Sequence, residues 1–326
     1  MTHSSTNDKA AHQNQKTPCR IPKVSLVAAT LALSLSATAT LATPSLTINN
    51  MQSVGSVEFR FSENPADPFL IGYDGVNLRF DYDYNPDARK NHNDWWQGIR
   101  AGAFDGEAKS AGNEDFDITT LYRSQDQVIL YCLDIFNDLE TAGFVEYSVY
   151  AFDDDAAGAP TTTTQRTITR GPWWWPSEET ITATGNLNNV LDFLGAVNDV
   201  LEDQYQYTFG DRNWLNPADR WISGAIQVGI WESLYDDYDS TNTSLDITDG
   251  HFSVTGLSNK GETLLSHAFN QMVSSESLDR SQVLLFQPVT GGQTLIGDPF
   301  DVPAPGTLVL LLSGLFLVRK VSRGSR

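Results

Sequence analysis

Hydrophobic residues alternate with polar ones along much of the first half of the chain. Val57, Phe59 and Phe61 occupy every second position, and the same alternation recurs in residues 144–152. A period of two is typical of strands that bury one face. These patterns predict a β-rich region over residues 46–170.

Other segments in this region are predicted as strands for different reasons. Residues 128–136 (VILYCLDIF) are almost continuously apolar, which indicates a central strand. Residues 69–84 contain Asp74-Gly75, a dipeptide that favours tight turns, so we expect a hairpin there. Weaker strand patterns occur at residues 99–104 and in the Thr-rich segment 161–170.

After residue 186 the hydrophobic period changes to that of a helix. Residues 187–204 carry apolar side chains three or four positions apart and predict an amphipathic helix, and residues 261–272 predict another. Two short apolar runs within residues 281–297 predict a closing hairpin.

The order of these elements indicates the fold class. Strands come first, helices follow and a few strands close the chain, which is an α+β arrangement. We therefore expect a β-rich lobe of sandwich or barrel type and a helical lobe at residues 186–275. Together they form a single domain over residues 43–300.

The helix expected at residues 216–235 (NPADRWISGAIQVGIWESLY) differs from the others because its apolar residues cover the whole circumference. Asn216 is a good N-cap and Pro217 suits the first helical position. A helix that is apolar all round is buried, so Gln227 lies in the core, where an unpaired amide costs a few kcal/mol. Two interpretations are open: Gln227 is hydrogen-bonded to backbone, or it has reacted with a thiol.

The N-terminal 42 residues predict a secretory signal peptide. A polar stretch ending in Arg20 and Lys23 precedes an apolar run at residues 24–35 and then small residues suited to cleavage. A retained membrane anchor is the alternative. Cys19 lies before the apolar run, so cleavage removes it.

The tail, residues 301–326, has the composition of a sorting signal. Val302-Pro303-Ala304-Pro305 precedes a short apolar run, and the chain then turns basic at Arg319 and Lys320. The run spans about 20 Å as a helix, less than the roughly 30 Å of a bilayer core.

This tail resembles the PEP-CTERM sorting signal of Gram-negative bacteria, with Ala304 where that family usually has Glu. The resemblance implies processing by an exosortase-type enzyme. It also implies transient membrane anchoring through the tail, followed by release to the cell surface or the extracellular polysaccharide.

Composition narrows the classes of partner. The chain holds 41 Asp and Glu against 21 Lys and Arg, a net charge of −20, which argues against nucleic acid or anionic lipid. Asp81, Asp83 and Asn85 imitate the start of a calcium loop, but Pro86 and His92 stand where that loop needs Gly and Glu. Weak calcium binding stays open, and we expect no defined metal site and no cofactor.

Candidate chemistry is otherwise sparse. No motif of the common hydrolases, nucleotide-binding proteins or zinc enzymes occurs, so we do not expect an enzyme. A secreted glycan-active enzyme is the weakest alternative. The three consecutive Trp at residues 173–175 predict either a sugar-stacking platform or an aromatic plug of the core.

Once the signal peptide is removed, Cys132 is the single cysteine, and three interpretations are open. It can be a buried free thiol or form an intermolecular disulfide. It can also attack the side-chain carbonyl of Gln227 with loss of ammonia, which would give an internal thioester able to acylate a partner's amine or hydroxyl.

Tyr131-Cys132 and the later segment AIQVGIWE, which contains Gln227 and Trp231, resemble the Cys-Gln thioester adhesin domains of bacterial surface proteins. The resemblance implies a bond between a β-rich lobe and a helical lobe, with Tyr131 and Trp231 sheltering it. The resulting expectation is an exported protein that attaches covalently to a polysaccharide or to another surface nucleophile. The alternative is a non-covalent structural protein of the exopolysaccharide or biofilm matrix.

Overall fold

The computed structural model describes residues 45–61, 70–81, 94–110, 127–139, 143–153, 156–170, 177–236 and 245–297. All of them belong to one compact unit, Thr40–Arg326. The expected signal peptide, the sorting tail with Val302 to Pro305, Arg319 and Lys320, and the Trp triplet lie outside the described residues.

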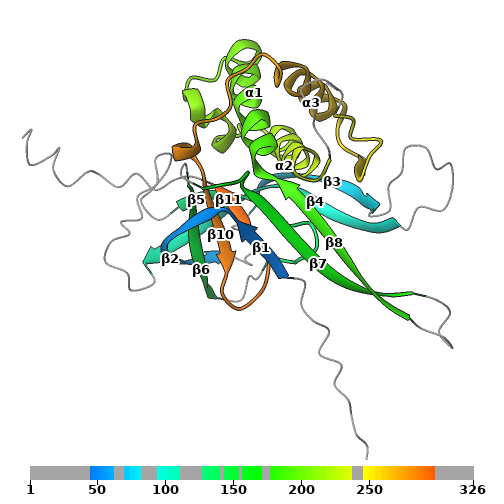
Figure 1. Ribbon diagram of the computed structural model, residues 1–326. Coiled ribbons are helices and arrows are strands. Elements are labelled where there is room, and N and C mark those ends of the chain that lie inside the picture. The colour runs from blue at the N-terminus through cyan, green and yellow to red at the C-terminus, as the bar shows by residue number, and fades with distance from the viewer. Residues whose placement is uncertain are drawn as a thin grey trace, which may run out of the picture. The chain divides into compact units, whose positions relative to one another are not determined.

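The described strands form a six-stranded barrel and two extensions (Figure 1). The barrel order is β2-β6-β10-β11-β5-β4, and the pairing of β2 with β4 closes it. The barrel strands are β2 (Met51–Phe61), β4 (Asp94–Ser110), β5 (Gln127–Cys132), β6 (Phe144–Phe152), β10 (Leu284–Pro288) and β11 (Leu295–Gly297).

Strand β4 is longer than its barrel partners, and this length creates the first extension. Its second half pairs with β2 on one side and with β5 on the other, through Phe104↔Leu130 to Glu107↔Gln127. Its first half leaves the barrel and pairs with β3 (Leu70–Asp81), which in turn pairs with β9 (Phe252–Thr255). Beyond Phe104 and Leu130, β4 and β5 therefore separate.

The second extension is a three-stranded sheet of β1 (Ser45–Asn49), β7 (Thr161–Arg170) and β8 (Ser177–Asn186). β1 covers only residues 161–165 of β7, so the rest of the β7–β8 ribbon continues past it (Figure 1). A hydrogen bond from the Gln287 side chain to the Leu46 carbonyl joins this sheet to barrel strand β10.

The three α-helices of the described residues pack on one another, and α2 lies against β3 and β4 (Figure 1). The helices are α1 (Leu187–Tyr205), α2 (Arg220–Tyr235) and α3 (Asn259–Gln271), with short 3₁₀ turns η1 (Gly210–Leu215) and η2 (Arg280–Gln282). The Asn186 side chain caps α1 by accepting from the Asn188 N–H at 3.1 Å, as Ser258 caps α3.

Two glycines let α2 approach its neighbours closely. A Cβ at Gly224 would lie 3.1 Å from the Asp74 backbone nitrogen on β3, and a Cβ at Gly229 would lie 2.0 Å from the Phe193 ring on α1. Every residue from 222 to 235 is buried, which confirms that this helix is enclosed on all sides.

Much of the sequence-based description is confirmed. The architecture is α+β, with a β-rich barrel and a small group of helices. The structure confirms the amphipathic helix after residue 186, the strand at 144–152 and the closing pair β10–β11.

The hairpin predicted at Asp74-Gly75 is wrong. β3 runs without a turn from Leu70 to Asp81, because β4 and β9 pair along its two edges. The Asp74 carboxylate instead accepts from the Ser258 N–H at 3.3 Å, where α3 begins.

The expected start of the buried helix at Asn216 is also wrong, because the helix begins at Arg220 with Asp219 as its N-cap. Asn216 instead ends η1, its N–H donating to the Asn213 carbonyl at 3.1 Å.

The central strand ends at Cys132 and not at Phe136. The Asp134 side chain accepts from the Phe136 N–H at 2.8 Å and turns the chain there. The short strand expected at 99–104 is part of the 17-residue β4.

Candidate functional site

Cys132 and Gln227, 95 positions apart in sequence, are in direct contact. The Cys132 N–H donates to Gln227 Oε1 at 2.8 Å, and Gln227 Nε2 donates to the Cys132 carbonyl at 2.7 Å. Both residues are almost fully buried. The side-chain amide thus pairs with the backbone of Cys132 as a neighbouring strand would.

The separation of β4 from β5 explains why this contact forms. Past Leu130, β5 has no β4 residue to pair with, and buried backbone groups need partners. α2 supplies them from one face: the Ser223 hydroxyl accepts from the Ala103 N–H of β4 at 2.6 Å, and Gln227, one turn later, binds Cys132 of β5. The helix therefore joins the two strands where they diverge.

The Cys132 thiol is held in its neutral form. Burial raises its pKa well above the ordinary value, the nearby Asp134 carboxylate raises it further, and a hydrogen bond from the Gln293 side chain lowers it by less. Within the described residues it is a free cysteine. A thiol in these surroundings is protected from adventitious oxidation, because the thiolate is the reactive form.

A turn after β5 fixes the surroundings of the sulfur. The Asp134 carboxylate, fully buried, accepts from the Phe136 N–H and from the Asn137 side chain. The Gln293 side chain donates to the Asp134 carbonyl at 2.8 Å. Leu133 N–H donates to the Thr294 carbonyl at 2.8 Å, which continues the β5–β11 ladder into this turn.

Sequence reasoning did not identify Gln293. It lies in the loop between β10 and β11, and only the pairing of Leu295 with Cys132 brings it to the sulfur. No local motif marks such a residue. The site therefore contains two side-chain amides. Gln227 is hydrogen-bonded to the backbone of Cys132, and Gln293 is hydrogen-bonded to its thiol.

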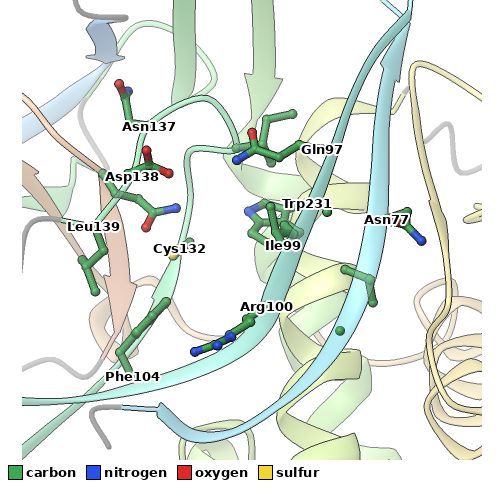
Figure 2. Close-up of a pocket in the computed structure, with 15 residues that line it drawn as sticks. Asn77, Gln97, Ile99, Arg100, Phe104, Cys132, Asn137, Asp138, Leu139 and Trp231 are labelled. Carbon is green, nitrogen blue, oxygen red and sulfur yellow. The ribbon is translucent and has the colours of Figure 1, made fainter. Parts of the chain in front are cut away.

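A cavity of about 560 Å³ extends from solvent to Cys132. Figure 2 shows Cys132 and Trp231 together in this cavity, with Gln97, Ile99 and Arg100 from β4 on one side and Asn137 to Leu139 on the other. The cavity occupies the space left by the divergence of β4 and β5. Its lining residues are Gly75, Val76, Asn77, Gln97, Gly98, Ile99, Arg100, Phe104, Cys132, Ile135, Asn137, Asp138, Leu139, Trp231 and Gln293.

Tyr131 and Trp231, which were expected to shelter a Cys132–Gln227 bond, lie on different sides of Cys132. Trp231, one turn after Gln227, lines the cavity and is 2 % exposed. Tyr131 is fully buried, donates to the Trp214 carbonyl at 3.0 Å and stacks on the Trp214 ring. Neighbouring strand residues point to opposite faces, so Tyr131 packs under the helices.

Tests for other kinds of site give little. Among the described residues, no group of three or more His, Cys, Asp or Glu side chains is arranged to hold a metal ion. No helix in the described part of the chain is long and apolar enough to cross a membrane. Asp83 to His92 of the calcium-like segment lie outside the described residues, and Asp81 ends β3.

No protein-family model, curated protein or solved structure matches the chain. The interpretation of the site therefore depends on its geometry.

This geometry can support one kind of chemistry directly. The Cys132 N–H polarises the Gln227 carbonyl, as an oxyanion-hole donor does. The hydrogen bonds lie along the edge of the strand, whereas the Cys132 side chain leaves the backbone out of that plane. The thiol therefore belongs to the residue whose backbone holds the Gln227 carbonyl.

Proposed function

We propose that this is an exported surface or matrix protein that forms an internal thioester between Cys132 and Gln227 and uses it for covalent attachment. The observation that carries the proposal is the pair of hydrogen bonds, 2.8 and 2.7 Å, between the Gln227 amide and the Cys132 backbone. They hold the carbonyl carbon beside the residue whose sulfur would attack it.

Bond formation balances without a further reactant. The Cys132 sulfur bonds to the Gln227 side-chain carbonyl carbon, the C–N bond breaks, and the thiol proton leaves with the nitrogen as ammonia. A general base is not required if the proton passes from sulfur to the departing nitrogen, which suits a thiol whose pKa is raised by burial. Proximity and the polarising N–H supply the activation.

The thioester would be an acyl donor. An amine or hydroxyl of a target attacks the Gln227 carbonyl carbon, the C–S bond breaks and the target's proton passes to sulfur. The target is then joined to α2 by an amide or ester. The 3 % exposure of Cys132 supports a bond that is shielded from bulk water and reached through the cavity.

Export and sorting form part of the proposal. The N-terminal 42 residues would direct secretion. The tail, with Val302-Pro303-Ala304-Pro305 and Arg319-Lys320, would anchor the chain in the membrane until an exosortase-type enzyme of a Gram-negative bacterium processes it. The protein would then act at the cell surface or in the extracellular matrix.

Intact mass spectrometry of the secreted protein tests the bond. The proposal expects a mass lower than the sequence mass by one ammonia, with Cys132→Ala and Gln227→Ala both restoring the full sequence mass. Asn189→Ala is the matched control, because it also removes a buried side-chain amide but lies on α1 and outside the cavity, so it should leave the ammonia loss in place. A folded wild-type protein with the full sequence mass would refute the proposal.

A second candidate function is a non-covalent structural protein of the exopolysaccharide matrix. The same two hydrogen bonds favour it, because they satisfy the Gln227 amide as an ordinary buried side chain. In that case Cys132 is a small core residue, and methylamine leaves the protein mass unchanged.

A further inference from the structure

We propose that the cavity beside Cys132 is the site where the acceptor binds, and that it takes a neutral, hydroxyl-rich carbohydrate in preference to an amine. This inference rests on the proposed thioester and specifies its target. It is carried by where the cavity lies and by the polar groups in its wall, and the charge of the chain disfavours acidic acceptors.

The cavity is placed to deliver an acceptor. Cys132 lies in its wall, and the proposed bond would put the Gln227 carbonyl carbon next to that sulfur. Trp231, from the turn of α2 that follows Gln227, completes this end. About 560 Å³ is within the usual range for sites that bind small molecules or one end of a larger one.

Uncharged polar groups dominate the polar wall. Four of its side chains are amides, namely Asn77, Gln97, Asn137 and Gln293. Each amide can donate and accept hydrogen bonds, as a sugar hydroxyl does. Half-buried Ile99 and Leu139 add apolar surface for the C–H faces of a sugar ring.

The donors in the wall distinguish a hydroxyl from an ammonium group. The Trp231 indole N–H is buried and has no hydrogen-bond partner among the described residues, although Trp231 lines the cavity (Figure 2). A hydroxyl oxygen can accept from this N–H, whereas an ammonium group has no acceptor atom.

The charged side chains of the wall also favour a neutral acceptor over a cation. Arg100 is a second strong donor, and Asp138 is the single carboxylate among the described residues of the lining; both are exposed. One carboxylate at an exposed position, with a guanidinium in the same wall, is a poor binding site for a cation. A net charge of −20 for the whole chain also disfavours acidic polysaccharides.

The transfer step balances for a sugar hydroxyl. The hydroxyl oxygen attacks the Gln227 carbonyl carbon, the C–S bond breaks and the hydroxyl proton passes to the Cys132 sulfur. The products are a glutamyl ester of the sugar and a free thiol. A neutral acceptor with a neutral leaving group avoids separating charge in a buried site.

Intact mass spectrometry of the secreted full-length protein provides the test. The protein is incubated separately with maltotriose, cellotriose, a glucuronate-containing trisaccharide, spermidine and methylamine. We expect ester adducts with the neutral trisaccharides to form faster than the spermidine amide. Methylamine is small enough to open the bond by itself and reports whether a thioester is present.

Variants of exposed amides connect the reaction to the cavity. Asn77→Ala removes one amide from the wall and should slow ester formation about tenfold, the effect of one lost hydrogen bond. Gln52→Ala is the matched control, because Gln52 is also an exposed strand amide but lies on β2 and outside the lining.

Ammonia loss and methylamine adducts without sugar esters would overturn the carbohydrate assignment and leave the thioester intact. Equal rates for Asn77→Ala and Gln52→Ala would overturn the assignment to this cavity. Faster esters with the glucuronate trisaccharide would overturn the preference for a neutral acceptor. Absence of both ammonia loss and methylamine adducts would refute the proposed function, and this inference with it.

Discussion

Replacing Cys132 by Ala should destabilise the protein far more than the loss of a small buried side chain explains. The thioester would close a loop between residues 95 positions apart. By analogy with disulfides, closing a loop of that length contributes about 4–5 kcal/mol to the free energy of unfolding. Removing the sulfur alone costs about 1 kcal/mol, similar to deleting one buried methyl-sized group.

The expected total for Cys132→Ala is therefore about 5–6 kcal/mol, a large share of the roughly 5–15 kcal/mol that stabilises a typical domain. For a domain of this size the loss corresponds to a decrease in Tm of roughly 10–20 °C. Urea unfolding followed by tryptophan fluorescence measures the loss in free energy of unfolding, provided that this free energy falls with urea concentration at the same slope in both proteins.

Wild-type protein opened by methylamine is the control, because it keeps the sulfur and lacks the crosslink. We expect it to lie within about 1–2 kcal/mol of Cys132→Ala. Wild-type, opened and Cys132→Ala proteins that all agree within about 1 kcal/mol would refute the crosslink argument.

The remaining predictions concern neighbours of the same site. Gln227→Ala removes the same crosslink and also leaves the buried Cys132 N–H without its acceptor, so it should cost about 5–8 kcal/mol, measured by chemical denaturation; a loss under 1 kcal/mol would contradict both contributions. In the Gln227→Ala chain the thiol stays free, and adding Asp134→Asn should lower the pH at which iodoacetamide alkylates it, because the Asp134 charge helps to raise its pKa. An unchanged alkylation profile would exclude that effect. Burial, with the nearby Asp236 and Asp246 carboxylates, raises the pKa of Glu232 well above its usual value. The contribution of Glu232 to the free energy of unfolding is therefore complete below about pH 4.5, and it is lost as the pH rises through the folded-state pKa. Glu232→Gln should therefore unfold at higher urea than wild type at pH 7, with the difference disappearing toward pH 4; a constant difference across that range would contradict a neutral buried Glu232.

Short-range signals predicted the parts of the site that depend on burial. The all-apolar circumference around Gln227 required a buried amide, and the continuous apolar run around Cys132 required a central strand. Both residues are buried, on α2 and β5. The expectation that they would meet came from the single cysteine and from the resemblance to Cys-Gln thioester domains.

The remaining features depend on how distant segments pair, which local patterns do not encode. Asp74-Gly75 favours a turn by itself, yet pairing on both edges keeps β3 extended. Gln293 reaches the sulfur through the β5–β11 register. The cavity lies where β4 and β5 are no longer paired, past the pair Phe104↔Leu130. The sequence of neither strand alone determines where this pairing stops.

Peptide mapping of the secreted protein tests the central claim most directly. Pepsin digestion at low pH, where a thioester resists hydrolysis, followed by tandem mass spectrometry should give one crosslinked species. It should join the peptide that contains Cys132 to the peptide that contains Gln227, with the mass of one ammonia missing. A linear Cys132 peptide with a free thiol, or a crosslink to Gln293, would contradict the account.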